Sequence, residues 1–373
     1  MRPRTLLSRP RTAPATSGDV EVRIVDPRTD PEPTGWSRFR KTSAWQPMWD
    51  YEQLRLESWL SRNPTVLGVL SKGGSVLGAC LAMSCTPWRG RRFGPSGGRG
   101  LSPGWAEVYL SWFSGHSAAV FADRVDAARR RELLRAFERA LAAHVGVGLL
   151  GVVYRAMPVD VAEAASGPGR AVREIDPTTV LVNRWESVDD WFASLRPPVR
   201  EVVEAAAETA STLDVTAGAG RTDLDAAELA TLLNTHRARQ DARAWRSGQR
   251  ARIAGLHLDT RSPIPTAYLA AFVRRPDVVT WTYRDGAGRL VAFHTLIDDR
   301  RGLALPHYAA LPVSEGGRPR LYADVYAHCV RHLVEARRPE LTAGRTLLDL
   351  KAGFGFTTRT LMSVAVPRPV MGR

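Results

Sequence analysis

The chain has 373 residues, of which 44% are hydrophobic and 24% are charged, and 11 are tryptophans. This composition indicates a globular protein with a sizeable core rather than a disordered chain, and the length predicts two domains. The net charge of +14 favours anionic partners such as phosphates, RNA or nucleotide-bearing cofactors, with a general surface bias as the alternative. No apolar run reaches about 18 residues, so no membrane span is expected.

The cysteines and the N-terminus bear on the compartment. The three cysteines, Cys80, Cys85 and Cys329, show no metal-ligand spacing. No metal is therefore expected, and a reduced, cytoplasmic location is predicted. Cys80 and Cys329 lie in apolar stretches and are predicted to pack in the core. Residues 1–19 lack the apolar region of a signal peptide and predict a disordered basic tail.

The first half of the chain alternates strand and helix patterns. A strand is predicted at 20–25 and a helix at about 47–61. Apolar runs on either side of Lys72-Gly73-Gly74 predict a β-hairpin of strands 65–71 and 75–84. The remaining expected elements are a Gly-, Arg- and Pro-rich loop at 86–104, a strand at 105–113, a helix at about 122–145, a strand at 149–156 and a linker at 162–171.

The second half repeats this order about 200 residues later. Its expected elements are a hairpin of strands 277–283 and 289–297, a strand at 302–311, a helix at about 320–337, and closing strands at 346–350 and 361–366. Helical patterns at about 188–211, 224–239 and 263–275 form an insertion between the two halves.

These patterns predict an α/β fold with a mixed sheet of the α+β type. We expect a first domain at 20–165 and a second at 166–373, with the helical insertion at about 188–275 belonging to the second. Two such units side by side predict a cleft between them, where ligands commonly bind.

The stretch GRTLLDLKAGFGF at 344–356 is the most informative in the chain. The protein has 49 arginines but three lysines, and Lys351 stands here beside Asp349, before a glycine-rich turn. An ammonium is a compact charge with an adjustable pKa, which a guanidinium is not. Lys351 is therefore a candidate site residue, with a solvated strand-end lysine as the alternative. Asp349 is a candidate for orienting Lys351 or a substrate amine, with a structural Asp–Lys pair as the alternative.

Three segments carry a resemblance. They are WESVDDWFASL at 185–195 leading into Arg200, the strand 289–297 followed by His307-Tyr308, and Leu321-Tyr322 at a helix start followed by Gly344 and KAGFG at 351–355. Together they resemble GNAT acyltransferases in the tandem arrangement of the Fem-type aminoacyltransferases and the BioF-like acetyltransferases. The resemblance covers roughly residues 50–366. It implies two tandem GNAT-like domains, and it implies that Lys351 meets an anionic part of the acceptor.

Two features depart from that family's pattern. Pro197-Pro198 reduces the basic segment to Arg196 and Arg200 and suits the start of a helix. The family's pyrophosphate loop, [Arg/Gln]-x-x-Gly-x-[Gly/Ala], is absent at 114–118 and 315–320, while the similar segment at 91–96 lies in another loop. Gly316-Gly317-Arg318 is still a candidate phosphate nest, with an ordinary turn as the alternative. The missing loop favours aminoacyl-tRNA over acyl-CoA.

Acyl transfer to an amine needs a neutral amine, a polarised carbonyl and a proton for the leaving group. The sequence has no nucleophile elbow, P-loop or His-Glu-x-x-His motif. His307 and Tyr308 are candidates for a general base or proton relay. His294 is a further candidate, with a hydrogen-bonded core histidine as the alternative. Tyr322 is a candidate donor to the leaving group or a packing residue, and the candidate substrate-binding cations besides Lys351 are Arg200, Arg318 and Arg345.

The sequence thus predicts a cytoplasmic, Fem-like N-acyltransferase. It would move an activated acyl or aminoacyl group, in the first reading from aminoacyl-tRNA, to a small-molecule or peptide amine. The second reading keeps the fold and uses acetyl-CoA or another acyl-CoA, and the third is a catalytically degenerate GNAT scaffold that acts as a binding module. The activated donor apart, no tightly bound cofactor is expected.

Overall fold

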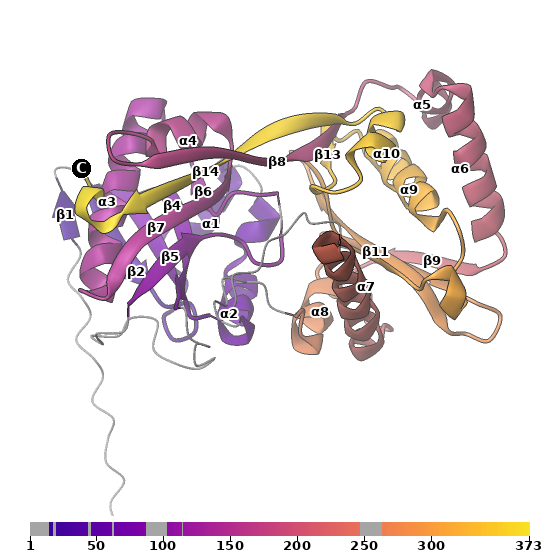
Figure 1. The fold of residues 1–373 in the computed structure, drawn as a ribbon, viewed down its shortest axis with the longest axis horizontal. Helices are drawn as coiled ribbons and strands as arrows, with labels where there is room; N and C mark the ends of the chain where they lie inside the picture. Colours follow the sequence, from indigo (N-terminus) through magenta and orange to yellow (C-terminus); the bar gives the residue numbers. More distant parts are fainter. Residues whose placement is uncertain are drawn as a thin grey trace, which may run out of the picture.

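The computed structural model describes residues 15–17, 20–43, 46–61, 63–86, 103–113, 115–246 and 263–373. In these residues one large mixed sheet runs through both halves of the chain, and helices lie on its faces (Figure 1). The strand order is β1-β2-β3-β4-β5-β7-β14-β8-β13-β12-β11-β10-β9, and β6 pairs with β4 beside this path. The predicted mixed α/β fold class is confirmed.

The first half follows the predicted order. Its elements are β1 (Ala15–Ser17), β2 (Val20–Val25), α1 (Trp36–Thr42), η1 (Gln46–Trp49), α2 (Tyr51–Leu60), β3 (Thr65–Lys72), β4 (Ser75–Cys85), β5 (Gly104–Val108), β6 (Ala119–Phe121), α3 (Ala127–Val145), β7 (Leu149–Met157) and α4 (Val159–Ala165). The β3–β4 turn uses Gly73 and Gly74 at φ 54° and 76°. Two successive positive φ angles are what a tight hairpin turn of this hand requires, and glycine adopts them without strain.

The second half contains several helices ahead of the repeated unit. Its elements are β8 (Ala171–Val182), α5 (Val188–Ser194), α6 (Pro197–Ala210), β9 (Asp214–Ala219), α7 (Ala226–Arg246), α8 (Thr266–Val273), β10 (Val278–Arg284), β11 (Leu290–Asp299), β12 (Gly302–Ala310), η2 (Val313–Glu315), α9 (Leu321–Glu335), β13 (Glu340–Thr342), α10 (Leu348–Gly353), β14 (Thr357–Pro367) and η3 (Arg368–Val370). As predicted from Pro197-Pro198, α6 begins at these two residues.

The same unit occurs twice. In the first half the hairpin β3–β4 is followed by β5, and α3 carries the chain across to β7, which is parallel to β5. In the second half the hairpin β10–β11 is followed by β12, and α9 carries the chain to β13, which is parallel to β12. All other strand pairs in the described residues are antiparallel. The predicted repeat of hairpin, strand, helix and strand is confirmed.

The two halves exchange their last strands. β8 follows the first half in sequence but pairs with β13 of the second half. β14 ends the second half but pairs with β7 of the first, and β8 and β14 pair with each other between them. In Figure 1 both cross from one half to the other as long strands, and the C-terminus lies beside the first half. The joint is therefore continuous β-sheet rather than a linker.

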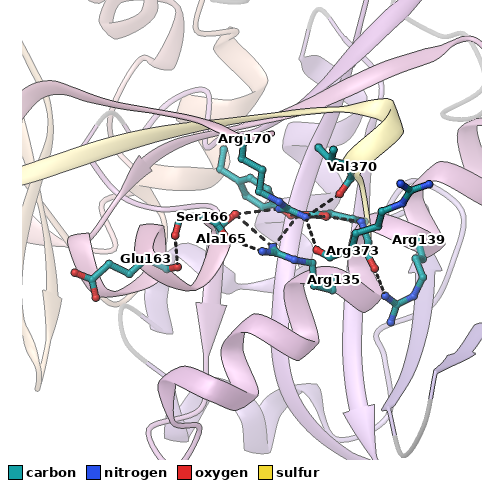
Figure 2. A network of polar contacts seen from close by, with 11 residues as sticks. Arg135, Arg139, Glu163, Ala165, Ser166, Arg170, Val370 and Arg373 are labelled. Atoms are coloured by element: carbon teal, nitrogen blue, oxygen red, sulfur yellow. Dashed lines mark hydrogen bonds and ion pairs between the residues drawn. The ribbon is translucent and has the colours of Figure 1, made fainter. Parts of the chain in front are cut away.

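A buried ion pair anchors the C-terminal segment to the first half. Arg170 binds both carboxylate oxygens of Glu138, at 2.7 and 2.8 Å, and the two side chains are 1% and 0% exposed. The same guanidinium donates to the carbonyl oxygens of Val370 and Arg373, both at 3.1 Å, and Figure 2 shows it lying between α4 and the end of the chain. The amide of Gly372 donates to Glu138 at 2.7 Å. This charge pair therefore joins α3 to the last four residues.

Some predicted elements differ from the structure. The stretch 346–350 was expected to be a strand, and this is wrong: Leu347, in the left-handed region at φ 58°, precedes the short helix α10. Short apolar runs do not distinguish a strand from a helix. The expected strand at 105–113 ends at Val108, and the expected linker at 162–171 contains the end of α4 and the start of β8. Within the expected N-terminal tail, Ala15–Ser17 pairs with β2, and the rest of it lies outside the described residues, as do residues 87–102 of the expected loop.

Different helices cover the two faces of the sheet in the second half. α5, α6 and α9 enclose one apolar cluster, whose α9 members include the predicted stripe Leu321, Val325, Cys329 and Leu333. α8 and the apolar residues of α7 pack on the other face and join the core of the first half. Cys80 lies in that core, so the core positions predicted for Cys80 and Cys329 are confirmed. None of the described helices combines the length and apolarity needed to cross a membrane.

Candidate functional site

The start of α9 is shaped by the loop that leaves β12. β12 pairs with β13 only at Leu303 and Ala304, so residues 305–310 have β11 on one side and no described strand on the other. The loop turns back at Gly316, at φ 89°, and a Cβ on Gly317 would stand 2.0 Å from the carbonyl oxygen of Leu311. A tight return of this kind needs glycine. α9 then begins without a side-chain cap, after Arg320 in the left-handed region at φ 61°.

A cavity of about 330 Å³ lies at this helix start, and we call it the α9 cavity. Its walls come from the second half of α7, the end of β12, the following loop and the first turn of α9. The lining residues are His236, Arg239, Gln240, Arg243, Tyr308, Ala310, Leu311, Pro312, Val313, Arg318, Pro319, Arg320, Leu321 and Tyr322. The set combines polar side chains of α7 and α9 with apolar side chains of the loop between β12 and α9.

The lining of the α9 cavity is rich in arginine, although one of these arginines, Arg239, lies 3.7 Å from the carboxylate of Glu315. Four of its lining residues are arginines and none is a carboxylate. Arg318 donates to the carbonyl oxygen of Gly316 at 2.8 Å, and Arg239 to that of Ala310 at 2.7 Å. Arg243 and Arg320 are exposed, and their side chains form no hydrogen bond or ion pair with the described part of the chain. Because helix N-termini also carry partial positive charge, the arrangement suits an anion.

Two tyrosines and a histidine supply the groups that can exchange protons. Burial, and then the neighbouring Tyr322, raise the pKa of the Tyr308 phenol, so this hydroxyl stays protonated at neutral pH. The rings of His236 and Tyr308 lie 5.4 Å apart, edge to face. The His236 Nδ1 lies 3.2 Å from the carbonyl oxygen of Ala310, and Nε2 lies 2.9 Å from the amide nitrogen of Gln240. The amide nitrogen of Ala310 also lies 3.4 Å from Nδ1, and burial lowers the pKa of His236, which favours a neutral ring.

The structure brings three of the predicted site residues together and separates the others. Tyr308, Tyr322 and Arg318 line the α9 cavity. His307 points to the opposite face of β12, as alternation along a strand requires, and packs among Phe113, Tyr268 and Phe272. Burial lowers its pKa to about 3.

His294 is fully buried on β11. Its ring stacks on Trp281 with centroids 4.6 Å apart and planes at 8°. Both ring nitrogens lack a hydrogen-bond partner, so His294 is a core histidine but not the hydrogen-bonded one of the alternative prediction. Burial lowers its pKa well below the usual value. His294 does not line the α9 cavity.

Lys351 lies inside the protein rather than at the lip of a cleft. The residue is 1% exposed, and its ammonium donates to the carbonyl oxygen of Ala343. Burial lowers its pKa to about 8. Asp349 is exposed on α10, and no hydrogen bond or ion pair joins it to Lys351, so the predicted Asp–Lys pair is absent. The alternative prediction for Lys351, a solvated lysine at a strand end, is also wrong, because the residue is buried and lies on α10.

The other predicted cations also lie away from the α9 cavity. Arg345 donates to the carbonyl oxygen of Asp176 at 2.9 Å and lies 3.5 Å from its carboxylate, at the joint between the halves. Burial lowers its pKa. Arg200 is half-buried on α6. In the described residues, no three His, Cys, Asp or Glu side chains gather as a metal site would require.

The sequence reasoning missed the contribution of α7. His236, Arg239, Gln240 and Arg243 follow the spacing i, i+3, i+4, i+7, which places them on one face of a helix. This polar stripe was visible in the sequence, but nothing local indicated that it faces the end of a strand 70 residues later.

No protein-family model matches the sequence, and no curated protein sequence matches it. Solved structures do match. FemX has a TM-score of 0.50 at 10% identity, over 84% of this chain and 89% of that chain. A tandem GNAT protein from the clavulanic acid biosynthesis pathway has a TM-score of 0.49 at 11% identity, over 93% and 98% of the two chains. L-PGS from Bacillus licheniformis has a TM-score of 0.46 at 9% identity, over 80% and 87%.

At 10% identity the likeness to FemX concerns the fold. It extends over 84% of the chain, in which each half contains the repeated unit with one described parallel strand pair. The expectation drawn from the resemblance is therefore confirmed at the level of the fold: the chain has a tandem GNAT-like fold.

Proposed function

We propose that the chain is an N-acyltransferase that takes an activated acyl or aminoacyl group from a phosphate-bearing donor and passes it to an amine. The observation that carries the proposal is the α9 cavity, with four arginines and no carboxylate at the start of a 15-residue helix. Guanidinium groups and a helix N-terminus both favour phosphate oxygens. The tandem GNAT-like fold supports the reaction class by analogy.

The chemistry assigned to the cavity is proton supply. The acceptor nitrogen attacks the acyl carbonyl carbon, and the bond from that carbon to the donor sulfur or oxygen breaks. The leaving group gains a proton and the nitrogen loses one, which restores the proton donor. Tyr308 is the proposed proton donor, because its phenol is protonated and lies at the cavity beside Tyr322. No covalent enzyme intermediate is needed when the donor is already activated.

Two donors are candidates. The net charge of +14 and the missing pyrophosphate motif support a Fem-like enzyme that uses aminoacyl-tRNA. The volume of the cavity, about 330 Å³, supports acyl-CoA as the second candidate. This value lies at the small end of small-molecule sites and suits a diphosphate group.

The test is turnover with each donor. Purified protein is incubated with a panel of amines and either acetyl-CoA or aminoacyl-tRNA, and thiol release or deacylation is followed. Arg318→Ala together with Arg320→Ala should raise the donor KM at least tenfold, and Tyr308→Phe should lower kcat by roughly 10²-fold or more. Arg331→Ala, an exposed arginine on the same helix, is the matched control. Donor binding without turnover would favour the degenerate scaffold. The absence of both donor binding and turnover would refute the proposal.

A further inference from the structure

Buried polar atoms without partners gather where the two halves meet. They are Gln53 Nε2, Glu57 Oε1, Trp112 Nε1, the Tyr268 hydroxyl, Arg275 Nη1, Thr280 Oγ1, Thr295 Oγ1 and His307 Nε2. Buried polar groups in folded proteins are nearly always hydrogen-bonded, to protein, water or ligand. A concentration of unpaired atoms in one region is therefore a place where water or a polar ligand can bind.

These side chains adjoin one another although they come from both halves of the chain. Thr280, Thr295 and His307 stand directly opposite each other on β10, β11 and β12. The ring of Tyr268, on α8, lies 6.0 Å from that of His307 and 4.3 Å from that of Trp112, which belongs to the first half. A wall of threonine hydroxyls and an imidazole thus faces aromatic side chains from α8 and from the segment after β5.

Glu57 brings a buried carboxyl group to the same place. It lies on α2, is 4% exposed, and is close enough to raise the pKa of the Tyr268 phenol. Arg275 is the nearest cation, but its guanidinium binds both oxygens of Asp277, at 2.9 and 2.7 Å, and forms no ion pair with Glu57. Burial raises the pKa of Glu57 to about 8, against the weaker opposing effects of Arg275 and of the Gln53 side chain, so a proton neutralises this carboxyl at neutral pH.

The other titratable groups that face this region do not supply the missing positive charge. His307 is neutral at physiological pH, because burial, and then Arg237 of α7, lower its pKa to about 3. Burial, and then Glu57, raise the pKa of Tyr268, while Arg275 and Arg237 oppose that shift more weakly. A cationic ligand could therefore replace the proton on Glu57.

We propose that this junction binds a small primary amine, whose ammonium is held by Glu57 with the Tyr268 hydroxyl and the unpaired His307 nitrogen as further acceptors. An ammonium offers three N–H donors, and these three side chains offer matching acceptors. Aromatic rings around the site, such as that of Trp112, also favour a cation. We call this the amine site.

The amine site rests on the proposed function, for which it would be the acceptor subsite; the bound ammonium would pass one proton to the Glu57 carboxylate before transfer, because the attacking amine must be neutral. His307 and Tyr308 are neighbours on β12 and point to opposite faces of the sheet. The amine site and the α9 cavity therefore lie on either side of the same strand, along residues 305–310, where β12 has left β13. An acyl group at this open edge lies between a donor on one face and an amine on the other.

Calorimetry on the full chain tests the amine site without relying on turnover. n-Butylamine is titrated at pH 7 in buffers of different ionisation enthalpy, with n-butanol as the uncharged control. We expect saturable binding of the amine only, with release of close to one proton, since Glu57 gives up its proton when the cation arrives. Glu57→Gln should weaken binding at least tenfold, whereas Glu52→Gln, exposed on the same helix, should leave it unchanged.

A second variant separates binding from a structural role. Tyr268→Phe removes an unpaired buried hydroxyl, so it should not destabilise the fold, but amine affinity should fall several-fold. Absence of amine binding by the native chain, binding without proton release, or unchanged affinity in Glu57→Gln would overturn the amine site. Stabilisation by acetyl-CoA is measured in parallel. Amine binding without transfer would refute only the proposed function, and transfer without an effect of Glu57→Gln would refute only the amine site.

Discussion

Replacing Arg170 should release the C-terminal segment from the first half. In Arg170→Ala the carboxylate of Glu138, 0% exposed, loses two hydrogen bonds and keeps Arg135 at 3.6 Å, the Tyr154 hydroxyl at 3.2 Å and the Gly372 amide at 2.7 Å. Removing one partner of a buried ion pair costs about 3–5 kcal/mol. Because Arg135 remains nearby, we expect the free energy of unfolding to fall by about 3–4 kcal/mol.

Urea unfolding followed by both tryptophan fluorescence and far-UV circular dichroism measures this loss, provided that the two transitions coincide. Arg131→Ala, exposed on α3, is the control and should change stability by less than about 0.5 kcal/mol. Hydrogen exchange should accelerate at Gly372, whose amide is bonded to Glu138. A loss below about 1 kcal/mol, with exchange unchanged at the C-terminus, would show that the ion pair does not hold this segment.

Three further predictions concern buried or close-packed residues. Burial lowers the pKa of Lys351 to about 8, so the cost of burying its charge is present below pH 8 and is relieved as pH rises toward 10.5. The free energy of unfolding should increase over that range by on the order of 3 kcal/mol. Lys351→Met should abolish this pH dependence, as measured by urea unfolding at several pH values. The pKa of Glu57 is raised to about 8, so the free energy of unfolding should fall by roughly 5 kcal/mol as pH rises from 4.5 to 8. If Glu57→Gln showed the same pH dependence in urea unfolding, Glu57 would not be its source. Gly317→Ala would place a Cβ 2.0 Å from the carbonyl oxygen of Leu311, so the loop must shift. We expect donor affinity to fall and the free energy of unfolding to decrease by about 1–3 kcal/mol. Unchanged donor affinity in a thermal-shift titration would exclude the loop from the site.

The sequence predicted those elements whose signal is local. The hairpin around Gly73-Gly74 follows from two glycines between apolar runs, and α9 from an apolar stripe at helical spacing. Pro197-Pro198 marked the start of α6. Because such patterns depend only on near neighbours in the chain, they also revealed that the unit occurs twice. Of the predicted site residues, Tyr308, Tyr322 and Arg318 line the α9 cavity, because they lie on either side of the turn between β12 and α9.

What the sequence could not predict depends on contacts between distant segments. The short run at 346–350 fits a strand as well as a helix, and only its packing places Lys351 inside the protein, bonded to the carbonyl oxygen of Ala343. The exchange of β8 and β14 joins residues almost 200 positions apart, which no local pattern encodes. The polar stripe on α7 reads as a solvated face until the fold sets it against the end of β12. The amine site needs side chains from both halves, because neither half alone encloses Glu57 together with Tyr268 and His307.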